Sequence, residues 1–266
     1  MNLYDYHPEM LNYSKGKLYN GTRWNFGDSL GKVIAEWMLA KKDLTLDSLV
    51  KGRKFFNTVG SNIFQSYQNA TIWGSGMLHE PLGKMLFLFR NPFVKLDVRA
   101  VRGAKSREVL LKYGHKCPEV YGDPAVLMPL IYTPKVCGDR NEILVVPQFL
   151  AEGEIRKKYP EYKMISLNTD DYKSVIDTIA SSKMVVTSSL HAILLAEVYG
   201  IPAVLFRTLE KETDFKYYDY YYSTGRRDVK IADTLEEALQ MSPLPIPDYS
   251  ALQQGLLDSF PYDLWE

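Results

Sequence analysis

The sequence predicts an α/β protein with parallel sheets, arranged as two doubly wound domains that face a cleft. Continuous apolar segments rich in β-branched residues alternate with segments of helical periodicity, as in parallel strands covered on both faces. The alternation restarts after a polar segment at 133–140. We therefore expect an N-terminal domain at 1–137, a C-terminal domain at 138–242, and an extension at 243–266 that packs back across the domains.

In the N-terminal half, short strands are expected at 54–60, 70–73, 93–101 and 120–121, and helices at 30–39 and 107–113. A glycine-containing turn with Asn25, Gly27 and Asp28 precedes the first helix, and Asp28 or Ser29 is placed to cap it. Gly27 would let the backbone approach a ligand closely. A plain capped turn explains the same residues.

The C-terminal half repeats the alternation in a regular way. Strands are expected at 142–147 and 163–167, and helices at 151–159 and 171–182. A short helix at 234–241 begins with a capping box of Thr234 and Glu237, and a last helix is expected near 249–260.

The segment 183–206 is the clearest βαβ unit. Two apolar strands flank a helix, which begins after Ser188 and Ser189 and ends at Gly200. His191 therefore falls on the first turn of a helix that starts at the carboxyl end of a buried strand. Open α/β sheets bind ligands at that edge, where helix N–H groups favour anions. A histidine there either packs against the turn or meets an anionic ligand.

Other strand ends carry residues suited to binding. Ser75 lies in a glycine turn after 70–73, and Arg102 with Ser106 follows 93–101. A guanidinium grips a carboxylate or phosphate with two parallel hydrogen bonds, although an ordinary salt bridge is the alternative. Asp123 follows a short strand, and capping of the next turn is the simpler explanation for an Asp-Pro pair.

The charge balance argues against a nucleic-acid partner. Lys plus Arg and Asp plus Glu are both 32, so there is no basic excess. Cys117 and Cys137 have neither disulfide-framework nor zinc-site spacing, so we expect a reducing compartment, the cytoplasm. No secretory leader or membrane-spanning segment is expected from the hydropathy.

Tyrosine is abundant, with 19 residues, and concentrates at 217–222. Such aromatic residues line carbohydrate sites or touch a membrane interface, although packed surface aromatics are commoner.

Several of these motifs, in this order, resemble the polysaccharide pyruvyl transferase family. They span roughly 23–227 and comprise Asn25-Phe26-Gly27-Asp28, Gly74-Ser75-Gly76, Arg102-Gly103 with Ser106, Gly122-Asp123-Pro124, Ser188-Ser189-Leu190-His191 with Ala196-Glu197 and Gly200-Ile201-Pro202, and 216–221 with Gly225-Arg226. An ordered set of this kind is more specific than any one short motif.

The resemblance implies a glycosyltransferase-B-like architecture of two Rossmann-type domains, with the acceptor side expected at 1–137 and the donor side at 138–242. It also implies transfer of pyruvate from phosphoenolpyruvate onto two sugar hydroxyls as a cyclic ketal, in bacterial cell-surface polysaccharide or its lipid-linked, undecaprenyl-type precursor. That substrate suggests the inner face of the membrane and peripheral contact with its surface. No cofactor or metal is expected beyond phosphoenolpyruvate as donor.

By position, His191 matches the family's histidine at the phosphoenolpyruvate site, and Arg102 matches an arginine that grips the donor. Many relatives carry arginine immediately before the Leu-His pair, where this chain has Ser189. Other cations must then meet the donor's charge, and the candidates are Arg102, Lys216, Arg207 and Arg226.

These considerations give a set of expected roles. His191 would act as general acid towards the enol or would protonate the leaving phosphate, and Asp28 or Asp123 would act as the base for a sugar hydroxyl. The remaining expected substrate-binding residues are Asn25, Gly27, Ser75, Ser106, Ser188, Ser189, Tyr217 and Tyr221.

Two other functions fit the same pattern. A nucleotide-sugar-dependent glycosyltransferase could hold a nucleotide diphosphate in the same cleft. A non-catalytic sugar- or anion-binding protein could stack its tyrosines on pyranose rings, with His191 only donating a hydrogen bond.

Overall fold

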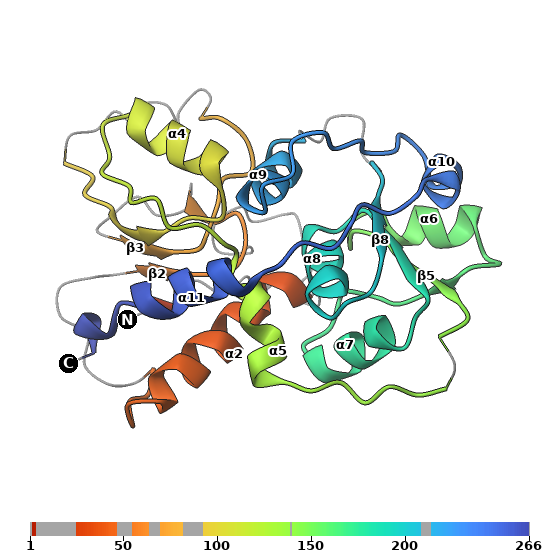
Figure 1. Ribbon diagram of the computed structural model, residues 1–266, viewed down its shortest axis with the longest axis horizontal. Helices are drawn as coiled ribbons and strands as arrows, with labels where there is room; N and C mark the ends of the chain where they lie inside the picture. The colour runs from red at the N-terminus through yellow and green to blue at the C-terminus, as the bar shows by residue number, and fades with distance from the viewer. Residues whose placement is uncertain are drawn as a thin grey trace.

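Two four-stranded parallel sheets lie side by side in the structure, a computed structural model (Figure 1). It describes residues 2–3, 25–46, 55–63, 70–81, 93–138, 140–208 and 214–265. The mixed α/β class with parallel sheets is as the sequence predicts. The limits of the two domains, and their glycosyltransferase-B-like arrangement, remain predictions.

The first sheet has the strand order β1 (Asn2–Leu3), β2 (Phe55–Asn57), β3 (Ala70–Trp73) and β4 (Asp97–Ala100). Helix α2 (Phe26–Ala40) packs on the face that carries Phe56 and Trp73. Helix α4 (Ala104–Lys112) covers the opposite face, where Val109 and Leu110 meet Ile72. Both faces are therefore buried, which explains the continuous apolar character of β3.

The second sheet has the order β6 (Lys163–Met164), β5 (Ile143–Val146), β7 (Met184–Thr187) and β8 (Ala203–Leu205). Helices α7 (Tyr172–Ala180) and α8 (Leu190–Val198) cover one face, and α6 (Glu152–Lys158) and α10 (Leu235–Gln240) the other. All four strands are parallel, but the strand order reverses at β5: the chain passes from β5 to β6 on one side and then continues with β7 on the other side. In open α/β sheets a ligand crevice forms at such a reversal.

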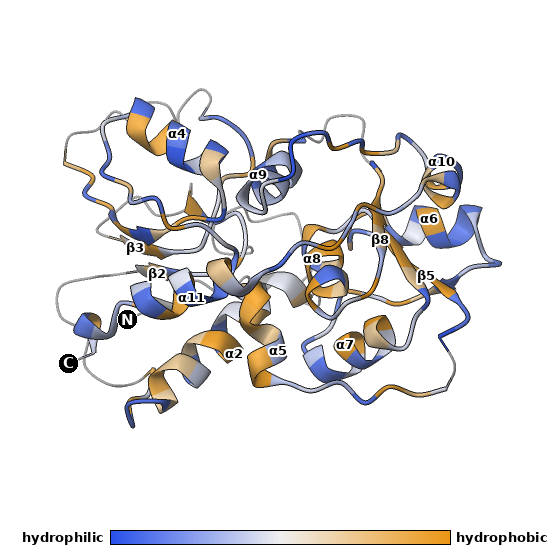
Figure 2. Ribbon diagram, in the orientation of Figure 1, coloured by the Kyte–Doolittle hydropathy of each residue, from blue (hydrophilic) through white to orange (hydrophobic). Residues whose placement is uncertain are grey.

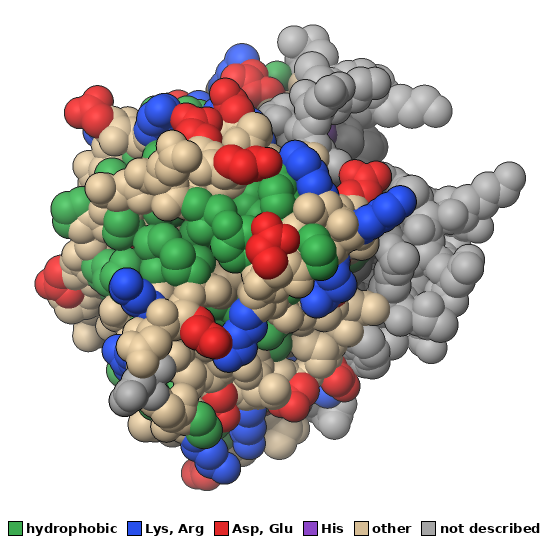
Figure 3. All heavy atoms as spheres, turned by 90° about the vertical axis from the view of Figure 1, so that its right-hand side faces the viewer, with side chains coloured by type: hydrophobic (Ala, Val, Ile, Leu, Met, Phe, Trp, Pro, Cys, Tyr) green, Lys and Arg blue, Asp and Glu red, His purple; other side chains and the backbone are tan. Residues whose placement is uncertain are grey.

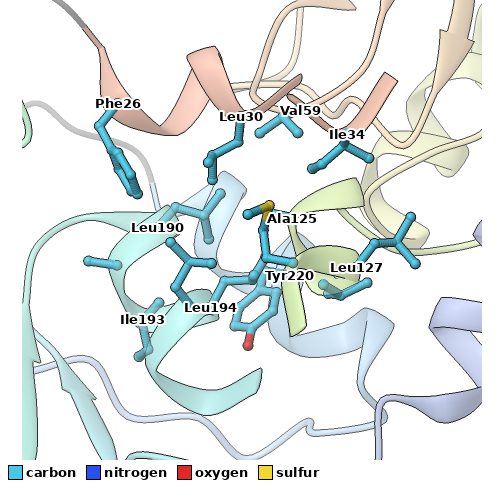
Figure 4. Close-up of a cluster of buried hydrophobic side chains, with 14 of the residues drawn as sticks. Phe26, Leu30, Ile34, Val59, Ala125, Leu127, Leu190, Ile193, Leu194 and Tyr220 are labelled. Carbon is cyan, nitrogen blue, oxygen red and sulfur yellow. The ribbon is translucent and has the colours of Figure 1, made fainter. Parts of the chain in front are cut away.

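Helix α8 lies at the centre of the molecule and is hydrophobic on nearly every side (Figure 2). A helix that is hydrophobic on every side must be surrounded by protein. Every residue from Leu190 to Glu197 is indeed buried. Its Leu190 and Leu194 meet Leu30 of α2, together with Ala125 of the 3-10 helix η2 (Pro124–Leu127) (Figure 4). One continuous core therefore joins the two sheets.

The end of the chain returns to the first sheet. After α9 (Phe215–Ser223) and α10, residues 243–249 cross the molecule to α11 (Ser250–Ser259), which lies against the first sheet (Figure 1). The indole Nε1 of Trp73 donates to the carbonyl of Leu256 at 3.0 Å. Phe260 and Trp265 pack edge-on against Phe56. The tail is therefore part of the core of the first sheet.

Three expectations about local structure need correction. Helix α2 begins at Phe26, with Asn25 as its N-cap, because Phe26 is fully buried and its N–H donates to the Leu167 carbonyl at 3.1 Å. The expected strand at 120–121 is only an isolated bridge, Tyr121 to Val101. The first sheet also shows no reversal among its described strands, so the doubly wound expectation holds only for the second sheet.

The end of the second sheet near α6 and α10 carries hydrophobic side chains that gather in a band on the surface, edged by charged groups (Figure 3). A third buried cluster lies in this part of the molecule, where Val145 and Val186 meet Leu235 and Ala238 of α10. Among the helices that the structure describes, none has the length and apolar character needed to cross a lipid bilayer.

Candidate functional site

A pocket of about 200 Å³ is formed where the carboxyl ends of strands from both sheets meet. Residues after β2, β3, β5, β6 and β7 contribute to it, together with the start of α2 and one residue of α9. The lining residues are Asn25, Ser61, Asn62, Leu78, Gln148, Phe149, Leu167, Ser189, Leu190, His191 and Lys216. Four of them, Asn25, Ser189, His191 and Lys216, are sequence-predicted site residues.

His191 is the second residue of α8 and is 9% exposed. Its Nδ1 edge lies directly against Gly27 in the first turn of α2, where an added Cβ would stand 1.8 Å from Nδ1. Only a residue without a side chain leaves room for the imidazole. Gly27 therefore does not line the pocket, but it decides where the ring sits.

Asp123 lies behind His191, with its Oδ2 atom 3.7 Å from Nε2. The carboxylate accepts hydrogen bonds from the N–H groups of Ala125, at 3.1 Å, and Gly60, at 3.5 Å. His191 Nε2 is buried and has no hydrogen-bond partner within the described part of the chain. A buried polar atom without a partner costs free energy on the order of 1–3 kcal/mol, which a ligand could recover.

Asp123 itself is 1% exposed and does not line the pocket. Its expected role as a base that touches a sugar hydroxyl therefore needs correction: its contact is with His191. Asp28 lies in the first turn of α2, but its side chain is outside the described part of the structure.

Lys216 provides a cation at the pocket. It is 7% exposed and its Nζ lies 4.7 Å from the centroid of the Tyr217 ring. Tyr217 donates its hydroxyl to the Ser188 carbonyl at 3.0 Å, which ties α9 to the end of β7. An ammonium held in a nearly buried position suits an anionic ligand.

The serines after β7 have structural partners. Ser189 caps α8 by accepting from Ala192 N at 3.4 Å, as the sequence predicts. The Ser188 hydroxyl accepts from Gln148 N at 2.8 Å and joins the ends of β5 and β7 at the reversal of the second sheet. Ser188 thus shapes the pocket without lining it.

Arg102 is fully buried and faces protein groups rather than the pocket. Its Nε donates to Asp219 Oδ2 at 3.1 Å, Nη1 to the Ser61 hydroxyl at 2.7 Å, and Nη2 to the Met77 carbonyl at 2.5 Å. Ser106 is also buried and donates to the same carboxylate at 2.6 Å. The expected direct grip on the donor needs correction, because Arg102 reaches the pocket only through Ser61.

The hydrogen-bonded cluster of Arg102, Ser106 and Asp219, called the latch below, joins opposite halves of the chain. Asp219 lies on α9, one turn after Lys216, whereas Arg102 and Ser106 follow β4. The latch therefore fixes the helix that carries Lys216 against the strand ends of the first sheet. No sequence pattern within this tyrosine-rich segment indicates that Asp219 is the partner of Arg102.

The side chains of Arg226 and Arg207 are bonded to carboxylates of the protein itself. Arg226 forms two hydrogen bonds with Glu197, at 2.7 and 2.8 Å. Burial lowers the pKa of Arg226, but the bonds to Glu197 raise it more, so the pKa lies above its usual value. Arg207 bonds to Asp214 and Asp233. Neither arginine lines the pocket.

Tyr221 and Ser75 are buried as well. Tyr217, Tyr220 and Tyr221 are at most 3% exposed, so these rings cannot stack on a sugar at the surface. Burial, followed by the nearby Glu197 carboxylate, holds the pKa of Tyr220 and of Tyr221 well above the usual value. The Ser75 hydroxyl donates to the Gly60 carbonyl at 3.0 Å and accepts from Asn62 N at 3.1 Å, so it joins the turn after β3 to the loop after β2.

Sequence reasoning did not single out several lining residues, among them Gln148, Phe149, Ser61 and Asn62. The strand-end rule could have found Gln148, because it follows the apolar run 142–147 at the same edge as His191. Within the described residues there is no group of three or more His, Cys, Asp or Glu side chains placed to hold a metal ion.

The chain is similar to a family model, to a curated protein and to a solved structure. A family model described as polysaccharide pyruvyl transferase matches residues 62–209, more than half of the chain. An uncharacterized protein of Acanthamoeba polyphaga mimivirus is 24% identical over 221 residues, which cover 74% of this chain and 69% of the relative. A functionally uncharacterized protein of Klebsiella pneumoniae has a crystal structure with a TM-score of 0.50 at 14% identity, covering 85% of this chain and 97% of that one. At this identity the structural likeness shows the fold alone.

Proposed function

Because the chain belongs to the polysaccharide pyruvyl transferase family, we propose that it transfers pyruvate from phosphoenolpyruvate onto two hydroxyls of a sugar, as a cyclic ketal. The observation that carries this proposal is His191, which lines a pocket together with a lysine and whose buried Nε2 forms no hydrogen bond with any residue that the structure describes. Family membership supports the reaction class. The donor and the product are our inference.

The donor carries a carboxylate and a phosphate, and two features of the pocket suit these anions. The first turn of α8 presents backbone N–H groups at the pocket, and Lys216 adds a nearly buried ammonium. Arg102 contributes indirectly, through its bond to Ser61. No cofactor is needed in this scheme.

His191 is assigned the proton transfer. A protonated imidazole donates a proton to the methylene carbon C3 of the donor while a sugar hydroxyl attacks C2. The proton of that hydroxyl returns to the imidazole. The C2–O bond to phosphate then breaks, the second hydroxyl attacks C2, and its proton leaves with the phosphate. Each step balances in atoms and charge, and such acid–base assistance is worth about 10²–10⁴ in rate.

Asp123 is assigned to orient and support the histidine. Its carboxylate faces Nε2 at 3.7 Å and is itself held by two backbone N–H groups. The carboxylate therefore stands at a fixed place beside the imidazole. Asp28, in the same turn as Gly27, remains the alternative base for a sugar hydroxyl.

We further propose where the reaction takes place. A cytoplasmic enzyme, at the inner face of a bacterial membrane, would act on cell-surface polysaccharide or its undecaprenyl-linked precursor. The family name supports a polysaccharide substrate.

The test is phosphate release from phosphoenolpyruvate in the presence of a panel of glycosides, with mass spectrometry of the product. His191→Ala should reduce turnover at least about 10²-fold with an unchanged melting temperature. His115→Ala, which lies outside the pocket, serves as the matched control and should keep wild-type rates. Near-normal turnover in His191→Ala would contradict the assignment, and stabilisation by nucleotide sugars without phosphate release would favour a glycosyltransferase.

A further inference from the structure

Gln148, one of the lining residues of the pocket, carries a buried hydrogen-bond acceptor that no described residue uses. Its side-chain Oε1 is fully buried and has no hydrogen-bond partner within the described part of the chain. Gln148 follows β5 at the reversal of strand order in the second sheet, and it lines the pocket with His191 and Lys216. Such a group is rare in folded proteins and calls for a ligand or an ordered water.

The backbone of Gln148 is held firmly. Its N–H donates to the Ser188 hydroxyl at 2.8 Å. The hydroxyl of Thr187 donates to the Val146 carbonyl at 2.6 Å, and the N–H of Ser188 donates to the same carbonyl at 3.3 Å. The ends of β5 and β7 are therefore joined, so the backbone position from which the Gln148 side chain extends is set before any ligand arrives.

The chemistry of this atom selects its partner. An amide oxygen accepts hydrogen bonds and repels the oxygen lone pairs of a carboxylate or phosphate, so it does not suit phosphoenolpyruvate. It suits a donor, and a sugar hydroxyl is one. The adjacent Phe149 also lines the pocket and offers an apolar ring beside the amide. An aromatic ring next to a single oriented polar group is the usual lining of a site for a small, partly apolar ligand.

We propose that Gln148 and Phe149 form the acceptor-sugar subsite, in which Gln148 Oε1 accepts a hydrogen bond from a hydroxyl of a neutral pyranose. This inference rests on the proposed function and deepens it, because it divides one pocket into two regions. Lys216 and the start of α8 serve the anionic donor, and the end of β5 serves the uncharged acceptor. The hydroxyl at Gln148 is one that does not become a ketal oxygen.

The test measures sugar binding directly, so that it does not depend on turnover. Ligand-observed NMR would follow methyl glucopyranoside, galactopyranoside and mannopyranoside on the full-length chain, then the monodeoxy analogues of the best binder. Gln148→Leu keeps the approximate size of the side chain but removes the acceptor. We expect it to weaken binding of the best glycoside about five- to tenfold, as loss of one neutral hydrogen bond does.

One monodeoxy analogue should bind the wild-type chain as weakly as the parent sugar binds Gln148→Leu, and should lose nothing further in that variant. Gln254→Leu, on the exposed side of α11, is the matched control and should bind like wild type. Equal binding by wild type and Gln148→Leu would overturn the inference, as would the absence of binding by any glycoside. If glycosides bind as expected but phosphoenolpyruvate releases no phosphate, the proposed reaction fails while the sugar subsite stands.

Discussion

Replacement of Gly27 by alanine should separate catalysis from stability. The added Cβ would stand 1.8 Å from His191 Nδ1, whereas real Cβ contacts under 3.0 Å are essentially never seen. The imidazole or the start of α2 must therefore move by at least about 1.2 Å. A displacement of this order at a reacting group costs roughly 10² in rate.

Stability should change much less, because two effects oppose each other. Alanine is favoured over glycine in a helix by up to about 1 kcal/mol, and this offsets strain from the displaced ring. Gly27 is the second residue of α2 and is preceded by a proper N-cap position. We therefore expect a melting temperature within a few degrees of wild type.

Gly153→Ala is the matched control. Gly153 is likewise the second residue of its helix, α6, but a Cβ there meets nothing within 4 Å. This variant should keep full turnover and melt slightly higher. The assays are phosphate release from phosphoenolpyruvate with a saturating acceptor, and thermal denaturation by circular dichroism. If Gly27→Ala retains turnover within about threefold of Gly153→Ala, the position of the His191 ring does not govern the reaction.

Two further predictions concern buried groups. Asp219→Ala leaves the Arg102 guanidinium buried without its counter-ion, so it should lower the free energy of unfolding by about 3–5 kcal/mol and the melting temperature by on the order of 10 °C. Glu142→Ala breaks an exposed ion pair and should cost under about 1 kcal/mol; equal losses of melting temperature in the two variants would contradict a stabilising role for the buried Arg102–Asp219 pair. Burial raises the pKa of the Cys117 thiol to about 12, so little of it is thiolate near pH 8. A thiol reagent should therefore label Cys137 alone until denaturant is added, and rapid labelling of both thiols in the native chain would contradict this prediction. Because the folded pKa of Cys117 is the raised one, its contribution to stability is complete below the ordinary thiol pKa of about 8.5 and declines as pH rises towards 12.

The strand-end geometry was predictable because it depends on local patterns. Apolar runs, a hydroxyl N-cap and a glycine stop place His191 and Ser189 at the start of α8. A strand covered on both faces is recognisable from its own residues, and the ligand-facing edge follows from chain direction alone. The same rule, applied to the run before Gln148, identifies the proposed sugar subsite.

The arginines show where sequence reasoning stops. A cation beside a glycine has the same appearance in sequence whether it faces a ligand or a buried carboxylate. Arg102 meets Asp219, and Arg226 meets Glu197, across separations of 117 and 29 residues. Partners this distant in the chain are brought together only by the packing of α9 against α4 and α8.

By itself, the sequence determined the α/β class, the order of strands and helices in the second half, and the edge at which His191 stands. Tertiary structure decided which side chains share the pocket: it placed Asp123 behind His191, buried the tyrosines, and turned Arg102 towards Asp219. The physical reason is that strands and helix starts are determined by residues close in the sequence. The partner of a charged group is instead determined by which segments pack together in the folded chain.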